Sequence, residues 1–256
     1  MCLSQVVRLA EIFALLGAGV LAGVASTVAS LASVVSYPVL LALGLPPVTA
    51  NMTNTVALVF AGAGAAAGSR PELAGQGPRL RRLGLVTALG GTAGAALLLL
   101  APARAFEVVA PCLIGAASLL LIVQPMITGL TARPNGEHSA MLRAALFGVA
   151  VYVGYFGAAG GILMLTVLIA MLDQPLARTV ALKNVVSGLA NAAAAVGFAL
   201  FGPVRWAAVA PLALGFLVGG WLGPMLVRRL PAQAMRIGIG VFGLALAVAL
   251  GIRTYG

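Results

Sequence analysis

The stretch TANMTN at residues 49–54 returns in altered form as TVALKN at residues 179–184, 130 residues further along the chain. A second pair of motifs has nearly the same spacing, because the glycine pair at residues 90–91 returns at residues 219–220. Two copies of a membrane unit, one of them inverted, are the usual architecture of secondary transporters, whose substrate site lies at the interface between the copies. The repeat therefore favours transport over catalysis as the function.

The composition excludes an ordinary soluble domain. Of the 256 residues, 62% are apolar and 8% are charged, and the mean hydropathy is +1.12, whereas soluble domains carry roughly 25% charged residues. Apolar runs of roughly 17–25 residues, each long enough to cross a hydrocarbon core of about 30 Å, recur along almost the whole chain. We therefore expect an all-α, polytopic, multi-pass protein of the cell inner (cytoplasmic) membrane, in contact with membrane lipid.

Several classes of function find no support in the residues. The net charge of +10 comes mostly from basic residues that flank apolar runs, as the positive-inside rule explains, so nucleic acid is not an expected partner. Cys2 and Cys112 are the only cysteines, and the one histidine, His138, lies in a polar linker. We therefore expect no metal site, no cofactor and no enzymatic activity.

The apolar runs predict six helical spans, near residues 50–68, 83–101, 106–128, 178–201, 206–227 and 236–252. Two longer regions, 9–44 and 144–173, contain small or polar interruptions, so each is predicted to be a broken helix or a re-entrant pair of half-helices. Each half then has about three full spans and one broken hairpin, which makes eight to ten hydrophobic segments in all.

The predicted domains follow the repeat. They are a first membrane repeat at residues 1–130, a cytoplasmic linker at 131–143 and a second membrane repeat at 144–256.

The distribution of basic residues predicts the inversion. Ten of the 15 basic residues fall in segments 70–82, 133–143, 178 and 228–236, and four fall in loops expected on the opposite side. The positive-inside rule assigns the first set to the cytoplasm. The basic loop is a different one in each half, so corresponding loops face opposite sides and both termini are predicted to lie outside the cytoplasm.

The charged groups inside the spans favour an anion over a cation. All five carboxylates map to loops or to span ends, which leaves none deep in the membrane to bind a cation. Lys183 lies about five residues inside a predicted span. Either its long stem snorkels to the interface, or its ammonium group faces the repeat interface and attracts an anion in a low dielectric.

Polar residues accompany Lys183 in both halves. Along one face of the second-half span these are Asn184, Ser187 and Asn191, and at the start of the matching first-half span they are Asn51, Thr53 and Asn54. Such side chains either join helices by hydrogen bonds or converge on a substrate from the two inverted copies.

The breaks supply further candidates. The N-terminus of a half-helix exposes unpaired N–H groups that can donate hydrogen bonds to an oxyanion. In the second break Gly160 and Gly161 would let the backbone approach a ligand, and in the first break Ser30 and Ser33 would supply hydroxyl donors. The predicted substrate-binding residues are Lys183, Asn184, Asn54, Thr53, Asn51, Ser187, Asn191, Ser30, Ser33, Gly160 and Gly161.

Five segments carry a family resemblance: YPVLLALGLPPVTANMTN (37–54), GAAGGILML (157–165), TVALKNVVSGLAN (179–191), FGPVRW (201–206) and LGFLVGGWLGPMLVRRLP (214–231). Through them the chain resembles the sulfite exporter TauE/SafE family of bacterial membrane permeases over essentially its whole length. The resemblance implies a permease that moves a sulfur-containing oxyanion or an organosulfonate, of the sulfite, sulfoacetate or thiosulfate class, across the cytoplasmic membrane. The alternatives are a carrier of another small organic anion, such as a carboxylate, and a membrane-embedded scaffold or enzyme.

Overall fold

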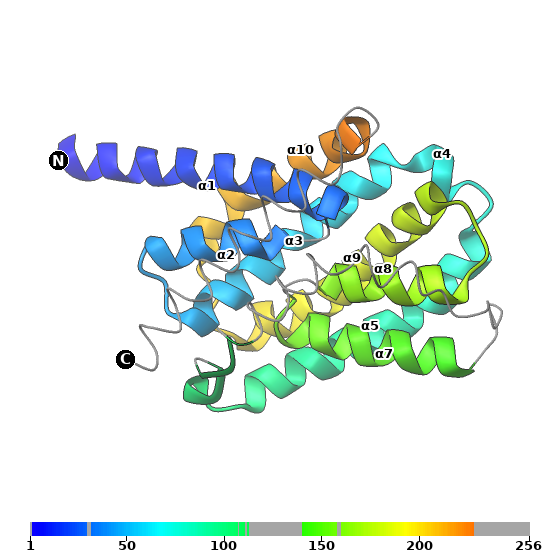
Figure 1. The fold of residues 1–256 in the computed structure, drawn as a ribbon. Helices are drawn as coiled ribbons and strands as arrows, with labels where there is room; N and C mark the ends of the chain where they lie inside the picture. Colours follow the sequence, from blue (N-terminus) through cyan, green and yellow to red (C-terminus); the bar gives the residue numbers. More distant parts are fainter. Residues whose placement is uncertain are drawn as a thin grey trace.

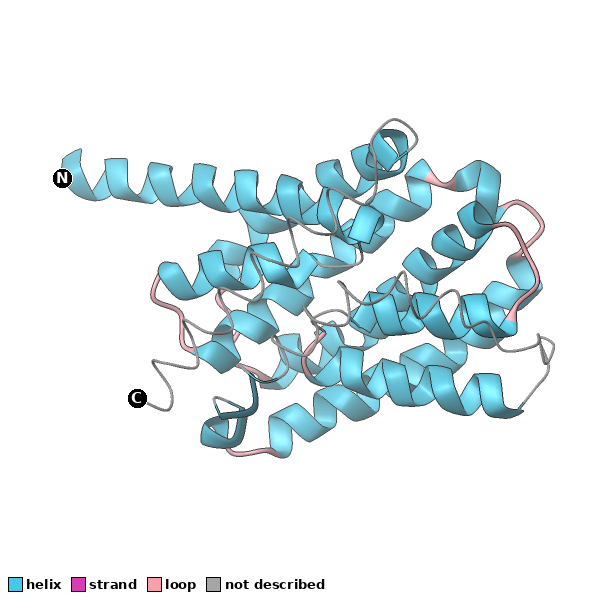
Figure 2. Cartoon of the chain, in the orientation of Figure 1, coloured by secondary structure: helices cyan, strands magenta, loops and turns pink. Residues whose placement is uncertain are grey.

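The structure is a computed structural model that describes residues 2–29, 32–106, 108–110, 112, 140–157 and 160–227. Within these ranges the chain is helical with short connecting turns and contains no strand (Figure 2). The predicted all-α class is confirmed. The predicted spans 106–128 and 236–252, the linker and Ser30 lie wholly or largely outside the described residues.

The helices in chain order are α1 (Cys2–Ala29), α2 (Ala32–Ala42), α3 (Pro47–Gly68), α4 (Arg70–Leu73), α5 (Gly77–Leu100), α7 (Ala140–Tyr155), α8 (Gly160–Met171), α9 (Leu176–Phe201) and α10 (Trp206–Val227) (Figure 1). Four stretches among them are long and apolar enough to cross a membrane: Leu9–Thr27, Gly77–Leu100, Leu176–Phe201 and Trp206–Leu226. The chain is therefore a polytopic membrane protein, as predicted.

Prolines mark where three of these helices begin. Pro47 and Pro78 lie in the first turns of α3 and α5, and Pro175 immediately precedes α9. A proline suits these positions because its fixed φ matches a helix and its missing N–H would have no partner there. Helix α5 starts earlier than the predicted residue 83, because its first turns carry arginines that an apolar-run criterion leaves out.

Both regions predicted to be broken are broken. Helix α1 ends at Ala29 and α2 begins at Ala32, whereas α7 ends at Tyr155 and α8 begins at Gly160. Gly157 lies in the second break with a φ of 76°, a left-handed conformation that glycine adopts without steric cost. The first break is asymmetric, because the 28 residues of α1 extend over about 42 Å while the 11 residues of α2 extend over about 16 Å.

The packing joins helices across the two sequence halves. Helix α10 packs against α1 and α3, while α5 packs against α7 and α9 (Figure 1). We call α1, α2, α3 and α10 bundle A, and α5, α7, α8 and α9 bundle B. In the repeat α5 corresponds to α10, so each bundle takes one helix from the opposite half of the chain.

The repeated glycines account for this exchange. A Cβ atom on Gly90 would lie 2.6 Å from the Cβ of Ala150 on α7, and one on Gly91 would run into the backbone of Ala190 on α9. On α10, the equivalent Gly219 and Gly220 are packed as tightly against α1 and α3. Small residues let membrane helices approach this closely. The glycine motif therefore seats α5 and α10 in the same way in opposite bundles.

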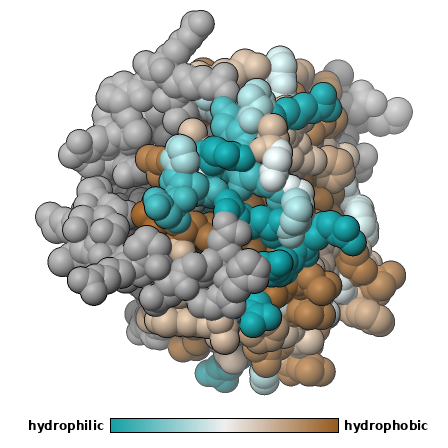
Figure 3. All heavy atoms as spheres, turned by 90° about the vertical axis from the view of Figure 1, so that its right-hand side faces the viewer, coloured by the Kyte–Doolittle hydropathy of each residue, from teal (hydrophilic) through white to brown (hydrophobic). Residues whose placement is uncertain are grey.

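The loops sort into two ends of the helix bundle. The connections from α3 to α5 and from α8 to α9 lie at the right-hand end of Figure 1, and those from α2 to α3 and from α9 to α10 lie at the left. Hydrophilic residues gather on the right-hand end, which faces the viewer in Figure 3. We call it the arginine-rich end, because it carries Arg70, Arg81 and Arg82 on its surface. Its assignment to the cytoplasm stays a prediction.

Candidate functional site

A cavity lies between bundles A and B, where both helix breaks meet α3 and α9. Its wall includes Ser26 and Ser33 from the first break, Gly157 and Gly161 from the second, and Lys183 from α9. The cavity has a volume of about 40 Å³, on a measure by which one water molecule needs about 10–15 Å³. It can therefore hold a few water molecules or a compact ligand.

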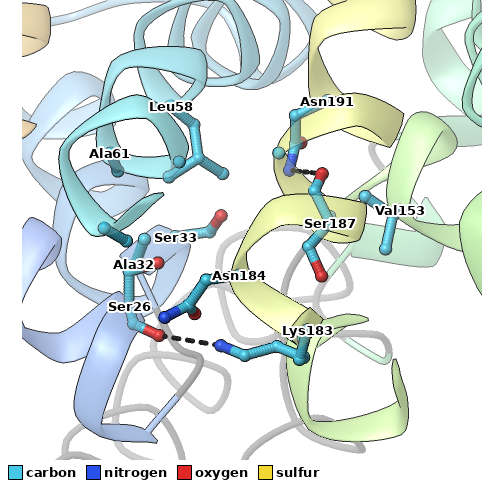
Figure 4. Close-up of a pocket in the computed structure, with 15 residues that line it drawn as sticks. Ser26, Ala32, Ser33, Leu58, Ala61, Val153, Lys183, Asn184, Ser187 and Asn191 are labelled. Atoms are coloured by element: carbon cyan, nitrogen blue, oxygen red, sulfur yellow. Dashed lines mark hydrogen bonds between the residues drawn. The ribbon is translucent and has the colours of Figure 1, made fainter. Parts of the chain in front are cut away.

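Lys183 supplies a positive charge to this cavity. Its side chain is 2% exposed, so it does not snorkel to the surface, and its Nζ donates a hydrogen bond of 3.3 Å to the carbonyl oxygen of Ser26 (Figure 4). Ser26 lies in the last turn of α1, at the end where the helix dipole is negative. The ammonium group therefore stabilises the end of α1 at the cavity wall.

The other polar residues predicted on α9 also reach the cavity. Asn184, Ser187 and Asn191 all belong to its lining. Asn191 Nδ2 donates to the carbonyl oxygen of Ser187, while Asn191 Oδ1 and Ser187 Oγ are buried and have no hydrogen-bond partner in the described part of the chain. A buried polar atom without a partner is rare in a native structure, because its desolvation is not compensated. These two oxygens are therefore available to a ligand.

In the first half, Asn54 orients a cavity residue. Ser36 Oγ donates to Asn54 Oδ1 at 2.6 Å, and Asn54 Nδ2 donates to Ser33 Oγ at 3.1 Å. Asn54 is outside the cavity lining, whereas Ser33 belongs to it. Asn54 thus holds the first turn of α2 beside the cavity.

Asn51 and Thr53 hold neighbouring elements in place. Asn51 Nδ2 donates a 3.1 Å hydrogen bond to the carbonyl oxygen of Tyr155, the last residue of α7. Thr53 Oγ1 accepts a 3.0 Å hydrogen bond from the backbone N–H of Arg205, in the connection between α9 and α10. Neither residue lines the cavity. Both side chains join segments that are distant in the sequence, which was one of the two roles that the sequence left open.

The two predicted glycines differ in their surroundings. Gly161 lines the cavity, but Gly160 is buried against α7, where a side chain would run into Val153. Of the predicted site residues, the structure thus brings together Lys183, Asn184, Ser187, Asn191, Ser33 and Gly161 at one cavity. Asn51, Thr53, Asn54 and Gly160 do not belong to its lining.

Sequence reasoning missed the close crossing of α3 and α9. A Cβ atom on Gly62 would lie 3.0 Å from Gly188 Cα, and both glycines line the cavity. Glycine is needed at this crossing because a larger side chain would push the two helices apart. The available signal was a small residue in each span, which is too common in membrane helices to single out.

A second cavity lies next to the first, toward the arginine-rich end. Its volume is about 220 Å³ on the same measure, and it is lined by Ser69 and Glu72 beside the α3–α4 junction and by Leu176 at the start of α9. Asn184 lines both cavities. We call this second cavity the vestibule, because it shares Asn184 with the central cavity.

The electrostatics of the central cavity favour an anion. Lys183 contributes a buried positive charge, and the first turns of α2 and α8 contribute Ser33 and Gly161 to the wall. Helix N-termini carry a partial positive charge and free N–H donors. Among the described residues that line the cavity there is no carboxylate.

Comparison with known proteins identifies the family of the chain. Residues 15–250 match the family model described as "Sulfite exporter TauE/SafE". Neither a search of curated proteins nor a search of solved structures found a match. Because the matched range covers nearly the whole sequence, the chain belongs to the TauE/SafE sulfite exporter family, whose members are membrane transporters of the sulfur-anion exporter type.

Proposed function

We propose that the protein is a secondary transporter that moves a sulfur-containing oxyanion or an organosulfonate across the inner membrane by alternating access. The observation that carries this proposal is the buried ammonium group of Lys183 at a cavity between two helix bundles. A positive charge in a low-dielectric cavity attracts an anion more strongly than the same charge in water. A bound anion would therefore gain binding free energy beside Lys183.

The vestibule suggests how the substrate reaches this site. It lies between the two bundles, with Thr27 and Pro224 of bundle A on one side and Ala177 and Val180 of bundle B on the other. A small rotation of one bundle against the other about the Gly62–Gly188 crossing would open or close the path past Asn184. Rigid-body movement of one unit against another is the usual basis of alternating access.

A carboxylate carrier would use the same cavity and the same charge, so the residues described here do not separate it from a sulfur-anion carrier. An enzyme is less well supported. The described residues contain no group of three or more His, Cys, Asp or Glu side chains that could hold a metal ion. Ser187 Oγ, a buried hydroxyl at the cavity, has no general base as a hydrogen-bond partner among them.

Counterflow in proteoliposomes tests the proposal. Vesicles loaded with unlabelled sulfite should accumulate labelled sulfite only when they contain the protein, and external thiosulfate or an alkanesulfonate should compete. Competition by carboxylates alone would favour the carboxylate carrier. A thermal stabilisation by lipid headgroup analogues, with none by anions, would instead favour the scaffold or enzyme.

A further inference from the structure

The hydrogen bond within α9 determines which atom of the Asn191 amide remains for a ligand. The side chain is 6% exposed and its Nδ2 lies 2.9 Å from the carbonyl oxygen of Ser187. A carbonyl oxygen can only accept, so the group that faces it must be the NH₂ group, and the opposite assignment would place two acceptors in contact. The unpartnered atom of this cavity residue is therefore Oδ1, which can only accept a hydrogen bond.

The hydroxyl of Ser187 is also without a hydrogen-bond partner among the described residues, unlike most described threonine hydroxyls. Most described threonine hydroxyls, such as those of Thr55 and Thr166, bond to a backbone carbonyl one turn earlier. Ser187 Oγ makes no such bond and points along α9 toward Lys183 in Figure 4. Lys183, Ser187 and Asn191 are spaced four residues apart, so they form one polar strip along the cavity wall.

Helix-to-helix attachment does not account for Asn191. Asn51 and Asn54 each bond to a different helix, whereas the side chain of Asn191 bonds only to its own helix within the described part of the chain. The Asn191 amide thus adds little to helix packing while it leaves a buried acceptor at the cavity. The desolvation of such an acceptor is compensated when a ligand donates a hydrogen bond to it.

We propose that the transported anion carries a hydrogen-bond donor, such as a hydroxyl group, which bonds to Asn191 Oδ1 while its anionic group lies toward Lys183. This proposal rests on the proposed function and narrows its substrate class. Lys183 and Asn191 line the same cavity from one helix, so both side chains can contact the same ligand.

Two ligands of the same shape test the proposal: 2-hydroxyethanesulfonate and 1-propanesulfonate, which differ only by a hydroxyl in place of a methyl group. Binding to the full-length protein in detergent, measured by ligand-dependent thermal shift, should be about tenfold tighter for the hydroxyl compound, because the analogue leaves the acceptor unpaired. Equal affinities, or tighter binding of 1-propanesulfonate, would overturn the proposal without touching the proposed function. If neither compound, nor sulfite, binds or is transported, the proposed function itself fails.

Two variants test whether Asn191 causes the tighter binding of the hydroxyl compound. Asn191→Leu should bring the ratio of the two affinities to about one, and a ratio that stays near ten would overturn the role of Asn191. Lys183→Gln should weaken the binding of both compounds and leave their ratio unchanged. Asn191→Ala repeats the test with a smaller side chain if the leucine variant folds poorly.

Discussion

Lys183 of bundle B bonds to the carbonyl oxygen of Ser26, in the last turn of α1 in bundle A. The reverse arrangement exists as well, because Asn51 of bundle A bonds to the last carbonyl oxygen of α7 in bundle B. In both cases a side chain from a long central helix, α9 or α3, stabilises the end of a helix that stops at the cavity. Each bundle thus holds the end of a broken helix of the other bundle in place.

The Asn51 bond makes a measurable contribution to stability. Substitution Asn51→Ala leaves the Tyr155 carbonyl without this partner, so the free energy of unfolding should fall by about 1–3 kcal/mol. Thr55→Ala is the control, because the Thr55 hydroxyl bonds only to the backbone of its own helix. Thermal unfolding in detergent should show a clearly larger loss for Asn51→Ala, and equal losses would contradict the inter-bundle role.

The α1–α10 contact depends on those glycines of α1 that face α10, such as Gly23, and not on Gly17. A Cβ atom on Gly23 would lie 2.8 Å from the backbone oxygen of Phe216, while one on Gly17 would meet nothing within 4 Å. Gly23→Ala should therefore cost about 1–3 kcal/mol through overpacking. Gly17→Ala should be neutral or stabilising, since alanine favours a helix over glycine by up to about 1 kcal/mol. If the two variants melt alike, the exchange of α10 into bundle A is wrong.

The arginine-rich end is predicted to face the cytoplasm. Ala74 at that end and Ala103 at the opposite end are both exposed, so single cysteines there can be labelled from water. In a background without Cys2 and Cys112, Ala103→Cys should react with an impermeant reagent added to intact cells. Ala74→Cys should react only after the membrane is opened. The opposite pattern would reverse the orientation of the whole chain.

Much of the fold follows from the sequence, because a membrane span is a long apolar run and a proline or a cluster of small residues marks its limits. The two breaks were predicted on this basis, as were the spans that became α3, α9 and α10. The exchange of α5 and α10 could not be predicted. The repeated glycines show that these helices are packed closely, but a glycine carries no information about which helix it contacts.

The site was predictable only in part, for a related reason. A helical spacing correctly groups Lys183, Ser187 and Asn191 on one face, because they share one rigid element. Asn51 and Asn54 are buried asparagines too, yet they bond to Tyr155 and Ser33 and do not line the cavity. The choice between joining helices and facing a cavity depends on partners that lie far away in the sequence.

The proposed transport depends on the charge of Lys183, and sulfite counterflow in proteoliposomes tests the role of this charge most directly. Lys183→Gln keeps a polar side chain but removes the buried charge. Arg104→Gln is the control, because it removes a charge from an exposed position at the end of the helix bundle opposite the arginine-rich end. At equal protein content, counterflow should fall at least about tenfold in Lys183→Gln, because a buried charge-assisted hydrogen bond is worth roughly 1.5–3 kcal/mol. Counterflow in Arg104→Gln should be unchanged. Wild-type counterflow in Lys183→Gln would show that the cavity does not bind the anion through this ammonium group.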